Sequence, residues 1–281
     1  RQLLTHTSGL PGWVPLAEIL PRHDNAVEAL AEVPLGAPPG ERFEYSCAGF
    51  ILLGRLAELL TGVGLAEFVA REIAAPLGLG AARYLPLDRP IPGDMAGRLV
   101  PTESRAVSDR GVSLMEAVRR SGQWAGEWEA RHPGGRARGV VHDENAAFLG
   151  GVAGNAGLFA TAGDLLSFGR MWLDGGACGQ GRLLGPDTVA AATRNRTPGL
   201  GENRGLGWQL PSTDSSFGDL VSPASYGHTG FTGTGLWIDP RHRLVAVLLT
   251  NRLQFGRANE RVYRIRRLFM NALLAGLSPG R

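Results

Sequence analysis

Residues 227–250 read GHTGFTGTGLWIDPRHRLVAVLLT. Apolar and β-branched side chains dominate residues 235–239 and 244–250, and the short segment 240–243 separates these two runs. Two such runs joined by a few turn residues are typical of an antiparallel hairpin. A third strand is predicted at residues 205–210, shortly before the hairpin.

A closing helix is predicted over residues 261–274. Its predicted apolar face consists of Val262, Ile265, Leu268, Phe269 and Leu273. Such a face is typical of a surface helix that packs on a sheet.

The earlier part of the chain reads mainly as helices. An apolar run over residues 48–60 has helical periodicity and stops at Gly62, a common C-terminal signal. Thr161 and Asp164 form a capping box before an amphipathic helix over residues 165–173. The sequence therefore predicts a mixed α+β fold, in which an antiparallel sheet flanked by helices adjoins a mostly helical lobe. We expect a single domain over residues 1–281, with the lobe in about 1–200 and the sheet and last helix in about 201–281.

Composition excludes several classes of protein. The chain has 281 residues, of which 43% are hydrophobic and 20% are charged, so a packed core is expected. The net charge is +3, all 29 basic residues are Arg, and the charges are spread along the chain, which argues against nucleic-acid binding. The longest charge-free apolar stretches, such as residues 244–249, are far shorter than the ~18 residues of a membrane helix.

The first candidate for chemistry is the segment 43–47, Phe-Glu-Tyr-Ser-Cys, just before a predicted helix. The positive end of a helix and nearby cations could lower the pKa of the Tyr45 phenol and let it act as a base. The alternative is that Tyr45 is a packed aromatic residue whose hydroxyl has a hydrogen-bond partner.

The second candidate is the glycine-rich segment 227–235, which contains His228 and Thr229. Glycines in a strand allow a ligand to approach the backbone closely, and a backbone N–H there can form half of an oxyanion hole. The alternative is a glycine-rich hairpin with one exposed histidine.

The third segment, 141–159, begins with Val-His-Asp-Glu-Asn. Its spacing matches no zinc pattern, so no metal is predicted and a polar turn beneath the site is favoured. Cys47 and Cys178 suit neither a disulfide framework nor a metal site, although one bridge between them stays open. The chain has no G-x-S-x-G elbow, P-loop or dinucleotide fingerprint.

Taken in order, these segments resemble the serine β-lactamase and penicillin-binding protein superfamily. The similarity is greatest to its class C β-lactamase-like branch of esterases and D-amino-acid peptidases, and it runs from residue 1 to about 275. Residues 3–10, Leu-Leu-Thr-His-Thr-Ser-Gly-Leu, are similar to the segment that follows the first helices of that branch. Residues 45–47 match its Tyr-x-Asn box with Cys in place of Asn, and residues 228–230 match its Lys-Thr-Gly box in the His-Thr-Gly form. Residues 141–159 are similar to a further stretch of the branch.

The resemblance implies an acyl-enzyme serine hydrolase with no metal or organic cofactor. Tyr45 would assist proton transfer at the nucleophile, and His228 would take the position of the box cation. Cys47, Thr229 and Gly230 would contact the substrate, and Phe231 would offer its backbone N–H to the oxyanion. The expected substrate is a small acyl, peptide or lactam compound, with no nucleic-acid partner. The expected source is bacterial; the compartment, cell envelope, periplasm or cytoplasm, and the oligomeric state stay open.

The nucleophile of this superfamily is the Ser of a Ser-x-x-Lys motif, and this chain contains no Lys. Ser8 lies in a loop segment and has no Lys partner. We therefore expect an N-terminally truncated copy of such a hydrolase, inactive alone, with a non-catalytic ligand-binding relative as the alternative. Cys47 is a poor replacement for an amide, and His228 carries less positive charge than Lys, so an ester is favoured over a β-lactam.

Overall fold

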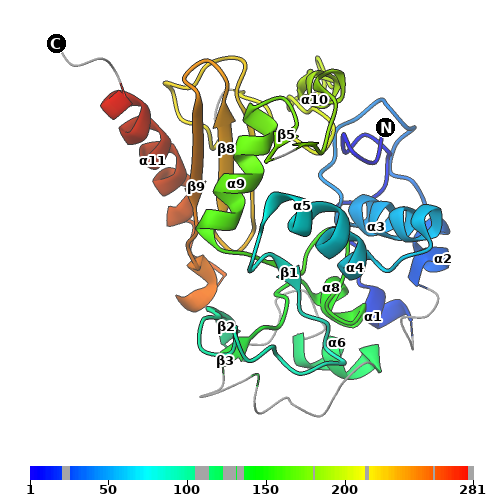
Figure 1. Ribbon diagram of the computed structural model, residues 1–281. Coiled ribbons are helices and arrows are strands. Elements are labelled where there is room, and N and C mark those ends of the chain that lie inside the picture. The colour runs from blue at the N-terminus through cyan, green and yellow to red at the C-terminus, as the bar shows by residue number, and fades with distance from the viewer. Residues whose placement is uncertain are drawn as a thin grey trace.

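The computed structural model describes residues 1–20, 26–104, 114–122, 131, 136–179, 181–212, 215–255 and 257–277. A three-stranded antiparallel sheet with helices on both faces adjoins a lobe built mainly of helices (Figure 1). The predicted α+β fold is therefore confirmed.

The helices are α1 (Leu16–Ile19), α2 (Ala26–Ala31), α3 (Cys47–Thr61), α4 (Leu65–Val69), a π-helical turn (Ala70–Ala74), α5 (Ala75–Leu77), α6 (Leu114–Ser121), α8 (Glu144–Phe148), α9 (Ala162–Leu173), α10 (Pro186–Thr193), a 3₁₀ turn (Arg252–Phe255) and α11 (Arg261–Leu277). Short strand pairs join β1 (Arg83–Tyr84) to β4 (Leu158–Phe159), β2 (Pro101–Ser104) to β3 (Arg136–Arg138), and β5 (Ala177–Cys178) to β6 (Gly181–Arg182).

The main sheet has the order β7 (Tyr226–Thr229), β8 (Gly235–Asp239), β9 (Leu244–Leu248). The predicted hairpin is confirmed, since β8 and β9 pair antiparallel from Gly235 opposite Leu248 to Asp239 opposite Leu244. The predicted strand at residues 205–210 is wrong. Only isolated bridges form there, from Gln209 to Arg204 and to Gly227, so this segment crosses the edge of β7 without joining the ladder.

Alternating side chains of β8 fix the layers of the fold. Leu236 and Ile238 pack with Phe168 and Trp172 of α9, whereas Trp237 on the opposite face packs with Met270 of α11. Every residue of β8 is therefore buried, with α9 and α11 covering opposite faces of the sheet (Figure 1). Although α9 precedes residue 200, it packs on the sheet, through its contacts with β8 and β9. The domain division near residue 200 stays a prediction.

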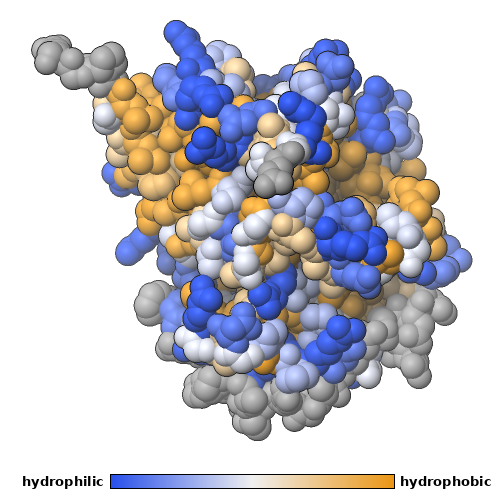
Figure 2. All heavy atoms as spheres, in the orientation of Figure 1, coloured by the Kyte–Doolittle hydropathy of each residue, from blue (hydrophilic) through white to orange (hydrophobic). Residues whose placement is uncertain are grey.

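The predicted apolar face of the last helix is partly wrong. The buried stripe of α11 consists of Val262, Arg266, Met270 and Leu274, which recur every fourth residue. Ile265 and Leu268 are instead 46% and 54% exposed, and Figure 2 shows apolar side chains gathered on the surface over α11. The difference arises because Arg266 finds buried carbonyl partners beneath the sheet.

The helical lobe presents the start of α3 toward the sheet. Ser46 caps α3 by accepting a hydrogen bond from the Gly49 N–H (3.1 Å), and Gly62 ends the helix with a positive φ of 68°, as predicted. The predicted capping box of Thr161 and Asp164 likewise starts α9. Tyr45 directly precedes Ser46, the N-terminal cap of α3. The start of this helix therefore fixes the position from which the Tyr45 side chain extends out of the lobe.

Buried α8 joins several segments of the lobe. The Asn145 side chain accepts a hydrogen bond from the Leu16 N–H (3.1 Å) and donates one to the Val14 carbonyl (2.7 Å). Asp143 caps α8 and also accepts a hydrogen bond from Asn155 (3.1 Å). Asp143 and Asn145 therefore tie α8 to other segments of the lobe, and the segment predicted as a polar turn begins a buried helix at Glu144.

Across the described residues, no single helix combines the length and apolar character needed to cross a bilayer; one pair, Cys47–Thr61 with Leu65–Leu77, does so only when both helices are counted together across an 80° bend.

Candidate active site

The two rings on which the sequence interpretation depends lie close together. Tyr45, at the start of α3, and His228, on β7, have ring centroids 6.0 Å apart and planes inclined by 36°. One ring comes from the helical lobe and the other from the sheet, so only the packed structure brings them together. Their catalytic roles stay predictions.

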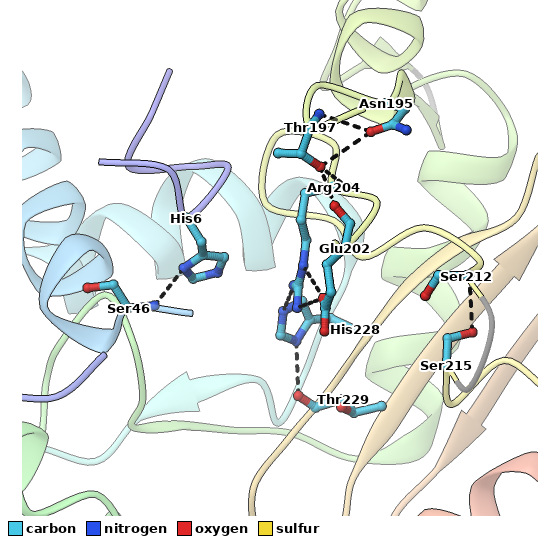
Figure 3. A network of polar contacts seen from close by, with 10 residues as sticks. All are labelled: His6, Ser46, Asn195, Thr197, Glu202, Arg204, Ser212, Ser215, His228 and Thr229. Atoms are coloured by element: carbon cyan, nitrogen blue, oxygen red, sulfur yellow. Dashed lines mark hydrogen bonds and ion pairs between the residues drawn. The ribbon is translucent and has the colours of Figure 1, made fainter. Parts of the chain in front are cut away.

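His6 is a neighbour of Tyr45 that the sequence interpretation did not single out. Its buried imidazole lies 4.4 Å from the Tyr45 ring and 4.9 Å from the Phe50 ring. Its Nδ1 accepts a hydrogen bond from the Ser46 N–H (2.9 Å; Figure 3), and its backbone has a φ of 56°, which is uncommon for a non-glycine residue. Burial and the Arg204 charge lower the pKa of His6 to about 3, so the ring is neutral. The sequence signal that could have singled out His6 is its position in the segment 3–10, one of the segments that resemble the superfamily.

Arg204 is the second residue that sequence reasoning missed. Its buried guanidinium lies 5.0 Å from the centre of the Phe43 ring and 5.6 Å from that of Tyr45. It forms a two-pronged ion pair with Glu202, with Nε at 2.9 Å and Nη2 at 2.7 Å from Oε2 (Figure 3). No sequence signal separates Arg204 from the other arginines of the chain.

The contacts of His228 determine its protonation. Its Nε2 lies 3.0 Å from Nη1 of Arg204, and its Nδ1 lies 2.9 Å from the Thr229 carbonyl oxygen (Figure 3). Because a guanidinium can only donate, Nε2 must accept and Nδ1–H must donate. Burial first, and the Arg204 charge second, lower the pKa of His228 to about 4. The imidazole is therefore neutral near pH 7, and the adjacent cation is Arg204. That His228 takes the position of the box cation stays a prediction.

The sequence-based hypothesis of a lowered phenol pKa is corrected. Burial, followed by the neighbouring Cys47, raises the pKa of Tyr45 to about 12, and the opposing effect of Arg204 is smaller. The Tyr45 hydroxyl is therefore protonated near neutrality, so it can donate a hydrogen bond and can release its proton only when a partner stabilises the phenolate.

Three of the predicted substrate-binding residues, Thr229, Gly230 and Phe231, directly follow His228 in the sequence. Thr229 ends β7, and the loop from Gly230 to Thr234, here called the strand-end loop, leads to β8. The Phe231 ring is half exposed and stacks on His142, with ring centroids 5.5 Å apart. The Arg252 guanidinium lies 4.4 Å from the centre of the Phe231 ring.

Cys47 begins α3 and lies close enough to Tyr45 to affect its pKa. Cys47 and Cys178 form no disulfide, so the bridge that the sequence left open is absent. Among the described residues, no three His, Cys, Asp or Glu side chains gather closely enough to bind a metal ion. In particular, Glu144 of the third segment pairs with Arg257 at 2.6 Å.

Comparison with known proteins places these features in a family. The chain matches the Beta-lactamase family over residues 1–269. A Salmonella heidelberg protein named as a D-alanyl-D-alanine carboxypeptidase is 34% identical over 257 residues, which are 90% of this chain and 54% of that protein. The chain thus spans about half the length of the curated relatives it matches.

Solved structures share the fold. A penicillin-binding protein homologue from Caulobacter crescentus has a TM-score of 0.62 at 19% identity, covering 97% of this chain and 70% of that one. Simvastatin synthase from Aspergillus terreus has a TM-score of 0.64 at 22% identity, covering 100% of this chain and 69% of that one. Since the family match extends over nearly the whole sequence, the chain belongs to the Beta-lactamase family.

Proposed function

We propose that this chain is part of an acyl-enzyme serine hydrolase that acts on ester, amide or β-lactam-like substrates, with esters preferred. The observation that carries the proposal is the 6.0 Å approach of the Tyr45 and His228 rings, from the two matched boxes. Family membership and the relatives named as D-alanyl-D-alanine carboxypeptidases support a hydrolase of this type.

The reaction has two halves, acylation of a serine and hydrolysis of the acyl-enzyme by water. The nucleophile must come from a Ser-x-x-Lys segment outside this sequence, because the chain contains no Lys. The protonated Tyr45 hydroxyl donates toward the nucleophile or leaving group, and the nearby Arg204 charge favours transient loss of its proton. Thr229, Gly230 and the Phe231 N–H line the acyl group, with the N–H facing the developing oxyanion.

The preference for esters follows from the chemistry of two positions. At Cys47 a thiol is a weak donor and acceptor, so it suits a substrate amide poorly. At His228 the neutral imidazole brings no charge, and the charge of Arg204 is shared with Glu202. Both features weaken recognition of an amide bearing a carboxylate relative to a simple ester.

A first experiment uses an extended protein, defined as this chain continued upstream to include an in-frame Ser-x-x-Lys segment. It should hydrolyse short-chain nitrophenyl esters faster than a chromogenic cephalosporin, and replacing the serine of that segment by Ala should abolish both activities. The 281-residue chain alone should hydrolyse neither. Faster opening of the cephalosporin would contradict the ester preference, and activity in the Ser→Ala control would contradict the nucleophile.

The second candidate function is that of a non-catalytic, ligand-binding relative. The absence of Lys from the sequence favours it, because the chain by itself cannot form the Ser-x-x-Lys pair. The nucleotide sequence upstream of the Arg1 codon separates the two candidates. An open frame that encodes Ser-x-x-Lys supports the hydrolase, whereas a start codon next to Arg1 supports the non-catalytic relative.

A further inference from the structure

The strand-end loop, Gly230 to Thr234, is held by its carbonyl groups. Each of its carbonyl oxygens accepts a hydrogen bond. The donors are Arg266 and the Gly233 N–H for Gly230, Arg252 Nε for Phe231, the Arg252 N–H for Thr232, the Thr250 hydroxyl for Gly233, and Arg266 and the Gly230 N–H for Thr234. Two arginine side chains thus hold three carbonyls of the loop that directly follows the His-Thr-Gly box.

Arg266 reaches this loop from beneath the sheet. It lies on the buried stripe of α11 and is only 3% exposed. Its Nη2 lies 2.6 Å from the Gly230 oxygen and 2.8 Å from the Thr234 oxygen. Within the described part of the chain, the guanidinium bonds these two carbonyls and pairs with no carboxylate. Its full charge therefore acts on the backbone of the loop, in surroundings of low dielectric constant.

The position of the Gly230 carbonyl connects Arg266 with the proposed chemistry. The Gly230 C=O and the Phe231 N–H are the two ends of one peptide group. A charged donor on the oxygen draws electron density toward it and makes the N–H at the other end a stronger donor. The same bond fixes the plane of the peptide and so the direction of the N–H.

We propose that Arg266 is a positioning residue that orients and polarises the Gly230–Phe231 peptide, so that the Phe231 N–H is a strong donor to the substrate oxyanion. This proposal rests on the proposed function, in which the Phe231 N–H faces that oxyanion. The proposal also explains why α11 buries an arginine at a position where an aliphatic side chain would pack more simply. A Phe231 N–H that is already oriented by Arg266 needs no reorganisation of the loop during the reaction.

Arg252 supplies a matched comparison. Its Nε bonds the Phe231 carbonyl at 2.7 Å, and that carbonyl belongs to the peptide group whose N–H is that of Thr232. Removing the Arg252 charge should therefore act chiefly on the Thr232 N–H, one peptide further along the loop.

The test is an amide ¹H–¹⁵N NMR spectrum of the unliganded 281-residue chain and its variants, with spectral dispersion and thermal unfolding as the check of folding. Arg266→Met should move the Phe231 ¹⁵N and ¹H resonances upfield, by more than any amide outside the strand-end loop except that of Gly235, whose peptide group contains the Thr234 carbonyl that Arg266 also bonds. Arg266→Gln, which keeps neutral donors, should give a smaller shift, and Arg266→Lys, which keeps the charge, the smallest. Arg264→Gln, on the exposed side of α11, should leave Phe231 unchanged.

Equal Phe231 shifts in the Lys, Gln and Met variants would overturn the proposal, because a packing role would not distinguish a charged from an uncharged side chain. If Arg266→Met does not fold, the Phe231 shifts of Arg266→Lys and Arg266→Gln are compared instead, and equal shifts in these two variants would overturn the proposal. Arg252→Gln, which removes the charge, should move Thr232 more than Phe231, and the reverse would also count against the proposal. Since no substrate is present, a failure of hydrolysis in the extended protein would contradict the proposed function and leave this measurement intact.

Discussion

Nη1 of Arg204 lies 3.0 Å from Nε2 of His228, a pairing in which only the guanidinium can donate. The contact fixes the tautomer of His228, and burial first and the Arg204 charge second lower the pKa of the ring, while the same guanidinium lies near the Phe43 and Tyr45 rings. The positive charge of the site therefore belongs to Arg204, and the histidine of the His-Thr-Gly box acts as a neutral hydrogen-bonding group.

The first prediction concerns Arg204 and the pKa of His228. Replacing Arg204 by Met should raise the pKa of His228 above about 4, because the guanidinium is the second cause of its lowering. The imidazole ¹⁵N shifts of His228 as a function of pH measure this. Arg204→Lys keeps a positive charge and should shift the pKa less, and an unchanged pKa in the Met variant would show that burial alone controls it.

The second prediction is a loss of stability in mild acid. The folded-state pKa values of His6 and His228, about 3 and about 4, lie below the value near 6.5 of an unfolded histidine. Between about pH 6.5 and 4 the unfolded chain takes up protons that the folded chain does not, so the free energy of unfolding should fall as the pH falls. Urea unfolding at several pH values measures this fall.

Asp143 opposes this trend, because burial raises the pKa of its carboxyl. Asp239 acts at lower pH, since its hydrogen bonds hold its pKa at about 2. The decisive comparison is therefore with His228→Gln, whose stability should depend less steeply on pH between 6.5 and 4. Parallel curves for the parent and this variant would contradict the neutral, buried state of His228.

The third prediction assigns Tyr45 to proton transfer. In the extended protein, Tyr45→Phe should lower ester turnover by about 100-fold or more, the usual scale for a general acid–base group. Tyr84→Phe is a matched control, because the phenol of Tyr84 also has a pKa raised to about 12, but its hydroxyl donates to the Ala153 carbonyl (3.0 Å). Steady-state turnover measures both, and full activity of Tyr45→Phe would remove the phenol from the mechanism.

The fourth prediction concerns substrate preference. Cys47→Asn gives the Tyr-x-Asn box its amide, which can both donate and accept a hydrogen bond. In the extended protein the rate of cephalosporin opening relative to ester hydrolysis should therefore rise. Cys178→Ser, at a cysteine on the short strand β5, should leave this ratio unchanged. A ratio that does not move in Cys47→Asn would exclude the thiol as the cause of the preference for esters.

The fifth prediction tests the packing that holds α3 in place. A Cβ added at Gly154 would overlap the Phe50 carbonyl oxygen and lie 2.9 Å from the Gly54 nitrogen. Gly154→Ala should therefore destabilise the protein by about 1–3 kcal/mol in urea unfolding. Gly163→Ala, whose Cβ would meet only the Thr161 hydroxyl at 3.7 Å, should be neutral or stabilising because it lies in helix α9. Equal effects of the two substitutions would contradict the close approach of α3 to Gly154.

Local sequence determined much of the fold. The apolar runs at residues 235–239 and 244–250, separated by a short turn, predicted β8 within its hairpin, and the stop signal at Gly62 predicted the end of α3, because these signals depend on neighbouring residues. The order of helices and strands predicted the α+β class, and two short boxes identified Tyr45 and His228 as candidates.

Only the tertiary structure decided which other groups surround those candidates. His6 and Arg204 lie far from each other in the sequence, and their type alone does not distinguish them from other histidines and arginines of the chain. The predicted apolar face of the last helix did not include Arg266, because helical periodicity cannot foresee carbonyls of a distant loop. The pKa values of Tyr45 and His228 likewise depend on desolvation and on charges that meet only after folding, which is why the sequence could name these residues but not their protonation states.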